Sequence, residues 1–319
     1  MARRVVAAIS VMSILCLCGC VNLGPLMAGR VEAVLVEESP RWFEVNRIAL
    51  IDVDGFISSS PGSWIGWSGT TAADVKEKLQ RAANDSRVCA VVLRINSPGG
   101  EVTASDMIHR EILRFKETTG KPVVAALMGL AASGGYYVAA ASDRIVVAPT
   151  SVTGSIGVVM QFVNIEGLFG KIGLRSEVVK SGDKKDIASP MRRMTAEERK
   201  ILQDINHDLF RRFMDVVRKG RPDMSDADAA AVSDGRILSG EQAVALHLAD
   251  SVGYLDDAIA QARELAGIRY ADVILYRPFP HYNTNVYARQ LGGGLIEQGL
   301  DRLLRHQGAA FLYVWSPGL

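Results

Sequence analysis

The chain has 319 residues, of which 48% are hydrophobic and 22% charged, and its formal net charge is +1. This composition excludes a disordered chain, a collagen-like repeat and a protein with many membrane-spanning helices. With 36 basic and 35 acidic residues, the charge balance does not point to a nucleic-acid partner. The length suits two small domains or one larger α/β unit.

The N-terminus has the form of a secretory leader. Two arginines precede an apolar run that is shorter than the roughly 20 residues a membrane-spanning helix needs. The segment Leu17-Cys18-Gly19-Cys20 then resembles the lipobox of bacterial lipoproteins. This resemblance implies removal of a signal peptide, residues 1–19, and acylation of Cys20. An uncleaved signal anchor is the alternative, and both readings predict an exported protein attached to a membrane.

The leader also accounts for most of the cysteines. Cys16, Cys18 and Cys20 lie in it or next to it, and only Cys89 remains in the body of the chain. Cys89 lies in an apolar run, where a lone cysteine is expected to be a small buried hydrophobic residue. The sequence therefore predicts no disulfide framework, although an exported protein would meet conditions that permit one.

From residue 47 onward, short apolar runs alternate with helical patterns. The predicted strands are Ile48–Val53, Val88–Ile95, Val123–Met128, Arg144–Ala148, Arg175–Val179 and Val273–Tyr276. The predicted helices are Ala73–Ala83, Ser105–Thr119 (closed by Gly120), Gly134–Ala141, a long helix after the capping-box pattern Thr195-Ala196-Glu197-Glu198, Ser239–Leu248 and Asp256–Ala266. Along the long helix, Leu202, Ile205, Leu209, Phe213 and Val216 share one apolar stripe.

This alternation predicts an α/β fold with a mostly parallel sheet and helices on both faces. Residues 20–46 lack a clear period and are expected to form a tether, and residues 47–276 are expected to form the folded domain. Residues 277–319 form a tail with a mixed apolar and charged stretch. This tail is expected to dock on a partner subunit or a membrane surface, or to form a solvated helix on its own domain.

Residues 96–100, Asn-Ser-Pro-Gly-Gly, join a predicted strand to a predicted helix. A glycine pair at such a junction lets backbone N–H groups approach a ligand closely, although an ordinary turn has the same composition. The segment lacks the G-x-G-x-x-G pattern of dinucleotide sites and the Gly-Lys-Ser/Thr of a P-loop. It therefore predicts no nucleotide cofactor.

Ser133 lies between a predicted strand and a predicted helix and is flanked by small residues. A hydroxyl there suits a nucleophile, because N–H groups at the helix N-terminus stabilise an oxyanion. The surrounding residues do not form the G-x-S-x-G elbow of α/β-hydrolases. A helix-capping serine is the alternative interpretation.

A serine nucleophile needs a base. The five histidines, His109, His207, His247, His281 and His306, lie in no Gly-rich or loop motif, and none is paired with a carboxylate in an evident pattern. A His-based triad and a metal site are both weakly supported.

The lysines of residues 180–186 are the other candidates. A lysine acts as a base only where burial keeps its amine neutral. The ordinary interpretation of a charged stretch such as residues 180–186 is a solvated surface loop.

Four short motifs follow one another in the chain: Asn-Ser-Pro-Gly-Gly at 96–100, Ala-Ala-Ser-Gly-Gly-Tyr-Tyr at 131–137, Thr-Gly-Ser-Ile-Gly at 153–157 and Lys-Ser-Gly-Asp-Lys-Lys-Asp at 180–186. Together they resemble the signal peptide peptidase A family, bacterial membrane-anchored Ser/Lys peptidases, over residues 47–276. Each motif alone is weak, but the ordered set is specific.

The resemblance implies a Clp protease/crotonase-like fold and a Ser/Lys dyad. By motif match, Ser133 is the nucleophile and Lys185 the general base. The adjacent Lys184 is chemically equal, so the choice between the two lysines depends on the spacing of the motif. Ser155 matches the serine that orients the lysine, and Gly100 and Gly134 match the residues whose backbone N–H groups form the oxyanion hole.

The resemblance also implies a serine endopeptidase of the cell envelope, with its catalytic domain outside the cytoplasm. Its expected substrates are residual signal peptides or other short membrane-associated segments, and it needs no cofactor, metal or nucleic acid. Single-domain members place the serine and the lysine on neighbouring subunits of a homo-oligomeric ring. Two alternatives are a non-catalytic envelope scaffold, which the intact Ser133 and Lys185 disfavour, and a crotonase-type acyl-CoA enzyme, which fits poorly behind a secretion signal.

Overall fold

A central parallel sheet organises the chain. The computed structural model describes residues 31–40, 45–60, 69–278 and 312–314. Within these residues, six parallel strands lie in the order β10-β2-β4-β5-β6-β9. Their bounds are Asp272–Pro278, Arg47–Ser58, Val88–Glu101, Val123–Ala132, Arg144–Val147 and Ser251–Val252.

Five further strands extend the sheet. β1 (Val31–Glu37) pairs antiparallel with β10, and β3 (Gly69–Thr71) pairs parallel with β2. β7 (Val152–Gly154) pairs parallel with the end of β5, and β8 (Ile237–Ser239) pairs antiparallel with β7. β11 (Leu312–Val314) pairs antiparallel with the last residues of β4. The sheet of the described residues is therefore mostly parallel, as the sequence predicts.

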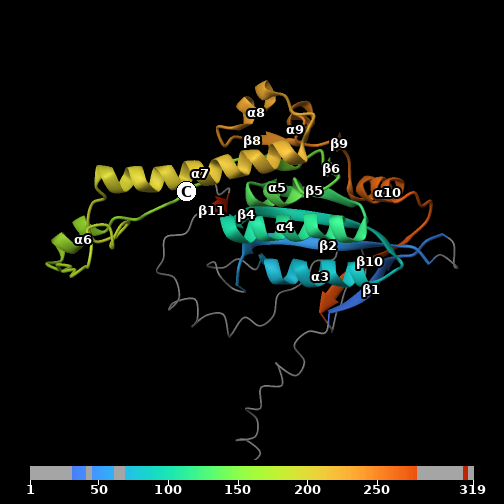
Figure 1. Cartoon of the computed structure of the whole chain (residues 1–319), viewed down its shortest axis with the longest axis horizontal. Coiled ribbons are helices and arrows are strands. Elements are labelled where there is room, and N and C mark those ends of the chain that lie inside the picture. Colours follow the sequence, from blue (N-terminus) through green and yellow to red (C-terminus); the bar gives the residue numbers. More distant parts are fainter. Residues whose placement is uncertain (1–30, 41–44, 61–68, 279–311, 315–319) are drawn as a thin grey trace, which may run out of the picture.

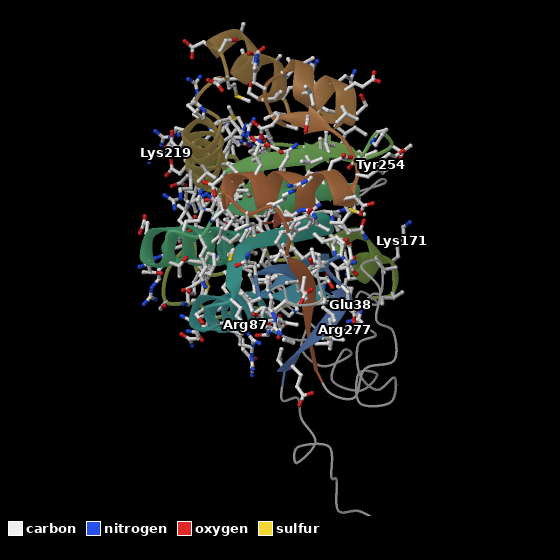
Figure 2. The ribbon with its side chains drawn as sticks, turned by 90° about the vertical axis from the view of Figure 1, so that its right-hand side faces the viewer. Glu38, Arg87, Lys171, Lys219, Tyr254 and Arg277 are labelled. Atoms are coloured by element: carbon white, nitrogen blue, oxygen red, sulfur yellow. The ribbon has the colours of Figure 1, made fainter. Side chains whose placement is uncertain are left out.

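Helices cover both faces of this sheet. One face carries α3 (Ala72–Asn84), α4 (Val102–Thr119), α5 (Gly134–Ala139) and the C-terminal half of α7 (Ala196–Gly220). The other face carries α10 (Leu255–Leu265). Figure 2 shows the layers edge-on, with Lys219 at the end of α7 on one side and Tyr254, just before α10, on the other. The short helices α6 (Glu166–Lys171), α8 (Asp226–Val232) and α9 (Gly240–Ala245) lie outside these layers (Figure 1).

The two-sided cover explains the continuous apolar strands. In β2, Ala49, Ile51 and Val53 face α3 and α4, whereas Ile48 and Leu50 face α10, and all five are fully buried. A strand of an antiparallel sheet with one solvated face would alternate apolar with polar residues instead. The α/β fold with helices on both faces, of the Clp protease/crotonase type, is confirmed.

The predicted helix ends are also found in the structure. Thr195 caps α7 in a capping box, in which its side chain accepts the backbone N–H of Glu198 and the Glu198 carboxylate accepts the N–H of Thr195. Gly120 ends α4 in the left-handed conformation, with a φ of 68°. Among the described helices, none is both long enough and apolar enough to cross a bilayer.

Several sequence expectations need correction. Arg175–Val179 forms no strand, because the whole stretch is exposed and no described strand lies beside it to complete its hydrogen bonds. The apolar stripe of α7 is buried only at Phe213 and Val216, while Ile205 remains 38% exposed because the first half of the helix projects beyond the sheet (Figure 1). Cys89 is half-buried rather than fully buried, with its thiol 3.4 Å from Asn46 Oδ1.

Two segments outside the predicted domain also join the sheet. The stretch expected as a tether contains β1, and the tail contains β11. Both strands pair with residues distant in the sequence, so a local pattern does not reveal them. The leader and most of the tail, including Cys20, His281 and His306, lie outside the described residues.

An aromatic cluster joins α4, α5 and α7. The Tyr137 ring lies 5.0 Å from that of Phe213 and 5.3 Å from that of His109, edge to face. The Tyr137 hydroxyl donates to Asp106 at 2.5 Å, and Asp106 also accepts from Arg212 at 2.7 Å. Burial lowers the pKa of His109 from 6.5 to about 4, against the opposing charge of Asp106, so His109 is neutral at pH 7.

This shift predicts a pH-dependent stability. Because the pKa in the folded state lies below that of an unfolded histidine, the unfolded chain binds the proton first, and stability falls as the pH drops from 6.5 towards 4. The contribution of His109 is about 3 kcal/mol across this window. Urea denaturation at pH 7 and at pH 4.5 should show a smaller difference for His109→Gln than for the parent chain. The exposed His207 provides the control: His207→Gln should leave the difference unchanged.

Candidate active site

Ser133 lies in a strained turn between β5 and α5. Its φ of 53° and ψ of −115° are rare for any residue but glycine. Its side chain is 1% exposed and makes no hydrogen bond to the N-terminus of α5, so it is not a capping serine. Two backbone hydrogen bonds hold the turn: the Ser133 N–H donates to Gly154 O at 2.8 Å, and the Ser133 carbonyl accepts from Tyr137 N at 2.8 Å.

Ser155 lies beside Ser133 at the end of the neighbouring strand. Ala132 of β5 is in register with Gly154 of β7, so the two serines are the next residues of two adjacent strands, which lie about 4.8 Å apart in a sheet. Ser155 also has a positive φ, of 50°, and its N–H donates to Arg236 O at 2.7 Å. The structure therefore brings these two predicted residues together.

Gly100 and Gly134 also meet at this place. A Cβ added to Gly134 would lie 3.1 Å from the Gly100 nitrogen, and one added to Gly99 would lie 2.6 Å from the Gly134 nitrogen. The backbones of β4 and α5 thus approach each other closely, and the Ser105 hydroxyl oxygen lies 2.6 Å from the same Cβ position on Gly134. Two backbone N–H groups beside a serine are the elements from which an oxyanion hole is built.

Lys185 lies in a different part of the molecule. The segment between α6 and α7 is held to the N-terminal end of α7, where Arg192 bridges Asp186 at 2.8 Å and Glu198 at 2.5 Å. α7 contacts α5 through Phe213. Phe213 lies 18 residues beyond Thr195, which corresponds to about 27 Å along the helix axis. The N-terminal end of α7 therefore projects away from α5 (Figure 1). Within one chain, the exposed Lys185 is therefore remote from Ser133.

The lysines of this segment differ in their partners. Lys180 is paired with Asp186 at 2.7 Å, and Lys184 is paired with Glu197 at 2.5 Å. The hydrogen bond to Glu197 raises the pKa of Lys184 and favours its charged form. The Lys185 amine has no such partner among the residues that the structure describes.

A histidine–carboxylate pair, absent from the sequence analysis, lies elsewhere. His247 Nδ1 is 3.0 Å from Asp228 Oδ2, on the exposed surface between α8 and α9. Neither residue contacts Ser133 or Ser155. The sequence does not reveal this pair because 18 residues separate its members, with Asp228 in α8 and His247 in the turn after α9. The pair lies outside the cluster of Ser133, Ser155, Gly100 and Gly134.

β11 is the feature of this site that the sequence analysis missed. Tyr313 is in register with Gly100, so a segment from the end of the chain lies along the predicted oxyanion-hole residues. On its other side, Leu312 forms a pair of hydrogen bonds with Val159, from N to O in each direction, at 3.1 and 3.2 Å. The three residues of β11 therefore lie between two stretches of backbone.

The fold and the site define a Clp-like α/β domain with a buried serine at a strand–helix junction. The chain matches the family model for Clp protease over residues 67–159 and that for Peptidase family S49 over residues 115–269. It is 36% identical over 222 residues to a putative protease of Synechocystis sp., an alignment that covers 70% of this chain and 75% of that protein. The chain belongs to peptidase family S49.

Two further relatives carry more specific names. The chain is 37% identical over 224 residues to a putative signal peptide peptidase SppA of Enterococcus faecium, covering 70% of this chain and 64% of the relative. It is 35% identical over 239 residues to Protease 4 of Salmonella typhi, covering 73% of this chain and 37% of the relative. The chain thus spans less than two thirds of the length of both.

The close approach at Gly100 predicts a steric effect of substitution. A Cβ there would lie 1.9 Å from the Ile57 carbonyl oxygen, a backbone atom that cannot rotate away. Gly100→Ala should therefore displace β4 from β2 and lower the free energy of unfolding by about 1–3 kcal/mol. Urea denaturation measures this loss. The matched control is Gly167→Ala in α6, where nothing lies within 4 Å; an equal loss in both variants would contradict the explanation.

Proposed function

We propose that this protein is a serine endopeptidase that uses Ser133 as its nucleophile and Lys185 of a neighbouring subunit as its general base. The observation that carries the proposal is the strained, buried Ser133 beside Ser155 and the backbones of Gly100 and Gly134. Membership of peptidase family S49 supports the same reaction class. The alternative role of Ser133 as a helix cap finds no hydrogen bond to support it.

The proposed reaction is acyl transfer in two steps. The neutral lysine amine takes the Ser133 proton as the serine oxygen attacks the peptide carbonyl, and the Gly100 and Gly134 N–H groups stabilise the oxyanion. The peptide C–N bond then breaks, and the leaving amine receives the proton. Water, deprotonated by the same lysine, hydrolyses the acyl-enzyme and restores Ser133. Ser155 is proposed to orient the lysine.

The choice of lysine rests on what each amine contacts. Lys184 is held in a charged pair by Glu197, which suits a structural role, whereas Lys185 has no partner among the described residues. The origin of the base in another subunit rests on the separation of Lys185 from Ser133 within one chain. Burial of the lysine in an assembled site would favour the neutral amine that the reaction requires.

Exposed apolar residues support assembly through this projecting segment. They are Val163, Leu168, Ile172, Leu174, Val178 and Val179, each more than half exposed. Apolar side chains concentrated on one segment are typical of a surface that is covered by another protein chain. We propose that the neighbouring subunit covers them, in a homo-oligomer in which each projecting segment reaches the serine of the next subunit.

The proposed substrates are residual signal peptides or other short membrane-associated segments. The name of the Enterococcus faecium relative supports this class. The leader with its Cys20 supports attachment to a membrane of the cell envelope, with the peptidase domain outside the cytoplasm. Such an attachment would keep the site close to peptides that remain in the bilayer after secretion.

The nucleophile and the base can be tested together. A fluorophosphonate probe should label Ser133 of the purified protein, and Ser133→Ala should remove the label. Lys185→Ala should lower peptide cleavage by about 10³-fold or more, because general-base and nucleophile activation are lost together. Its matched control is Lys184→Ala, which should retain most of the activity. Equal losses in the two lysine variants would contradict the assignment of the base.

Mixing tests whether two subunits share one site. Ser133→Ala and Lys185→Ala proteins, each inactive alone, should regain part of the activity when they assemble together, because some interfaces then pair an intact serine with an intact lysine. Native mass spectrometry verifies that mixed oligomers form. Mixed oligomers without any activity would show that both residues must come from the same chain.

A further inference from the structure

Ser97 lies where β4 departs from its regular pairing with β2. Asp54 of β2 is paired with Asn96 of β4. The next pair is Phe56 with Gly99, so β4 uses three residues where β2 uses two. Such a bulge interrupts the ladder of hydrogen bonds between two strands. The backbone groups at this point therefore need other partners, because buried N–H and C=O groups are rarely left unpaired.

The Ser97 hydroxyl supplies these partners. It donates a hydrogen bond to the Gly55 carbonyl of β2 at 2.6 Å and accepts one from the Gly99 N–H at 3.0 Å. A serine hydroxyl has one hydrogen to donate and two lone pairs that accept, so the two bonds use it in both roles. Pro98, which lies between Ser97 and Gly99, has no N–H of its own to offer. Ser97 is fully buried, so water does not replace its hydroxyl.

The turn that this hydroxyl holds leads directly to the proposed oxyanion hole. Gly99 has a φ of 101°, and the next residue is Gly100, one of the two proposed donors. Ser97 also lies against the other donor's helix, since its carbonyl oxygen is 2.8 Å from the position of a Cβ on Gly135. Gly135 directly follows Gly134 in α5. Ser97 thus lies between the two segments of backbone that are proposed to stabilise the oxyanion.

We infer that Ser97 is a positioning residue of the oxyanion hole. The inference rests on the proposed function. By binding the Gly99 N–H and the Gly55 carbonyl together, the Ser97 hydroxyl sets the direction in which the following N–H, that of Gly100, points. It acts through the Gly99–Gly100 peptide and takes no part in the proton transfers at Ser133. Its removal would leave a buried donor and a buried acceptor unpaired, and the peptide between them would be free to rotate.

Ser97→Ala in the full, assembled chain tests this role. A donor of an oxyanion hole acts on the transition state more than on the bound substrate, so its misalignment should lower kcat and leave KM nearly unchanged. Loss of a whole donor costs about 10²–10³-fold in kcat, and a misdirected donor should cost about 10–100-fold. A kcat equal to that of the parent chain, or a loss that appears only in KM, would overturn the inference.

Thr70→Val is the matched control. Thr70 is also a buried hydroxyl residue on β2, where it accepts from the Asp54 N–H at 2.8 Å and donates to the Asp54 carbonyl at 3.0 Å. Both bonds therefore go to the residue before Gly55. Urea denaturation should show that Thr70→Val and Ser97→Ala are both less stable than the parent, whereas only Ser97→Ala should lose kcat. An equal loss of kcat in the two variants would show a general effect of β2 and contradict the role of Ser97.

A tetrahedral inhibitor provides a readout that a loss of stability does not change. A peptide boronic acid adds to a serine oxygen, and one of its oxygens then occupies the oxyanion position. The inhibition constant of this compound should rise in Ser97→Ala by about the same factor as kcat falls, because both report binding to the oxyanion hole. Equal inhibition constants in the parent and in Ser97→Ala would overturn the inference.

Ser97→Cys keeps the test decisive if Ser97→Ala does not fold. A thiol fills a similar volume but is a weak donor and a weak acceptor, so this variant should fold and lose about three- to tenfold in kcat. An unchanged kcat in folded Ser97→Cys would overturn the inference. Failure of both variants to fold, measured by circular dichroism, would show that Ser97 holds the fold rather than the oxyanion hole, and would overturn it as well.

Fluorophosphonate labelling of the parent chain separates this inference from the proposed function. A parent chain that is active and labelled at Ser133, together with a fully active Ser97→Ala, would reject the role of Ser97 and leave the peptidase proposal intact. An unlabelled Ser133 in folded, assembled parent protein would reject both.

Discussion

The site depends on backbones that approach one another more closely than side chains permit. At Gly100, a single methyl group would lie 1.9 Å from the Ile57 carbonyl oxygen, and at Gly99 it would lie at the same distance from the Tyr313 carbonyl oxygen. Gly99 also has a φ of 101°, which only glycine adopts without strain. The backbone atoms around Gly99 and Gly100 are the place where four elements meet: β2, β4, β11 and α5. The backbone N–H groups of Gly100 and Gly134 beside Ser133 therefore have fixed positions before any substrate arrives.

The same packing sustains the strain at the two serines. A non-glycine residue in a rare backbone region costs on the order of 1–3 kcal/mol, and both Ser133 and Ser155 are of this kind. Each lies at the end of a strand with paired neighbours, and the Ser133 N–H and the Ser155 N–H both have backbone acceptors. The sheet, covered by helices on both faces, thereby holds the two serines at the ends of adjacent strands in backbone conformations that a relaxed loop would not keep.

The sequence predicts much of this arrangement because its signals are local. Continuous apolar strands, the capping box at Thr195 and the left-handed Gly120 depend on neighbouring residues. The motifs at Gly100, Ser133 and Ser155 lie at the carboxyl ends of parallel strands, which share one edge of the sheet. β1 and β11 depend on partners far along the chain, so no local pattern shows them. Arg175–Val179 has the composition of a strand, but no described strand pairs with it. Likewise, the location of Lys185 is set by how α7 projects, which the helical period alone does not determine.

A division of the dyad between subunits would make catalysis depend on assembly. Among the described residues of one chain, the proposed base Lys185 lies remote from Ser133, while β11 pairs with β4 and packs Tyr313 against the rings of Tyr137 and Phe213. Assembly would then supply the lysine and bury the apolar residues of the projecting segment in one event. Because such an equilibrium follows mass action, activity would depend on the local concentration of subunits. Attachment to a membrane would raise that concentration by confining the subunits to a surface, and this would link the proposed anchor at Cys20 to the proposed chemistry at Ser133.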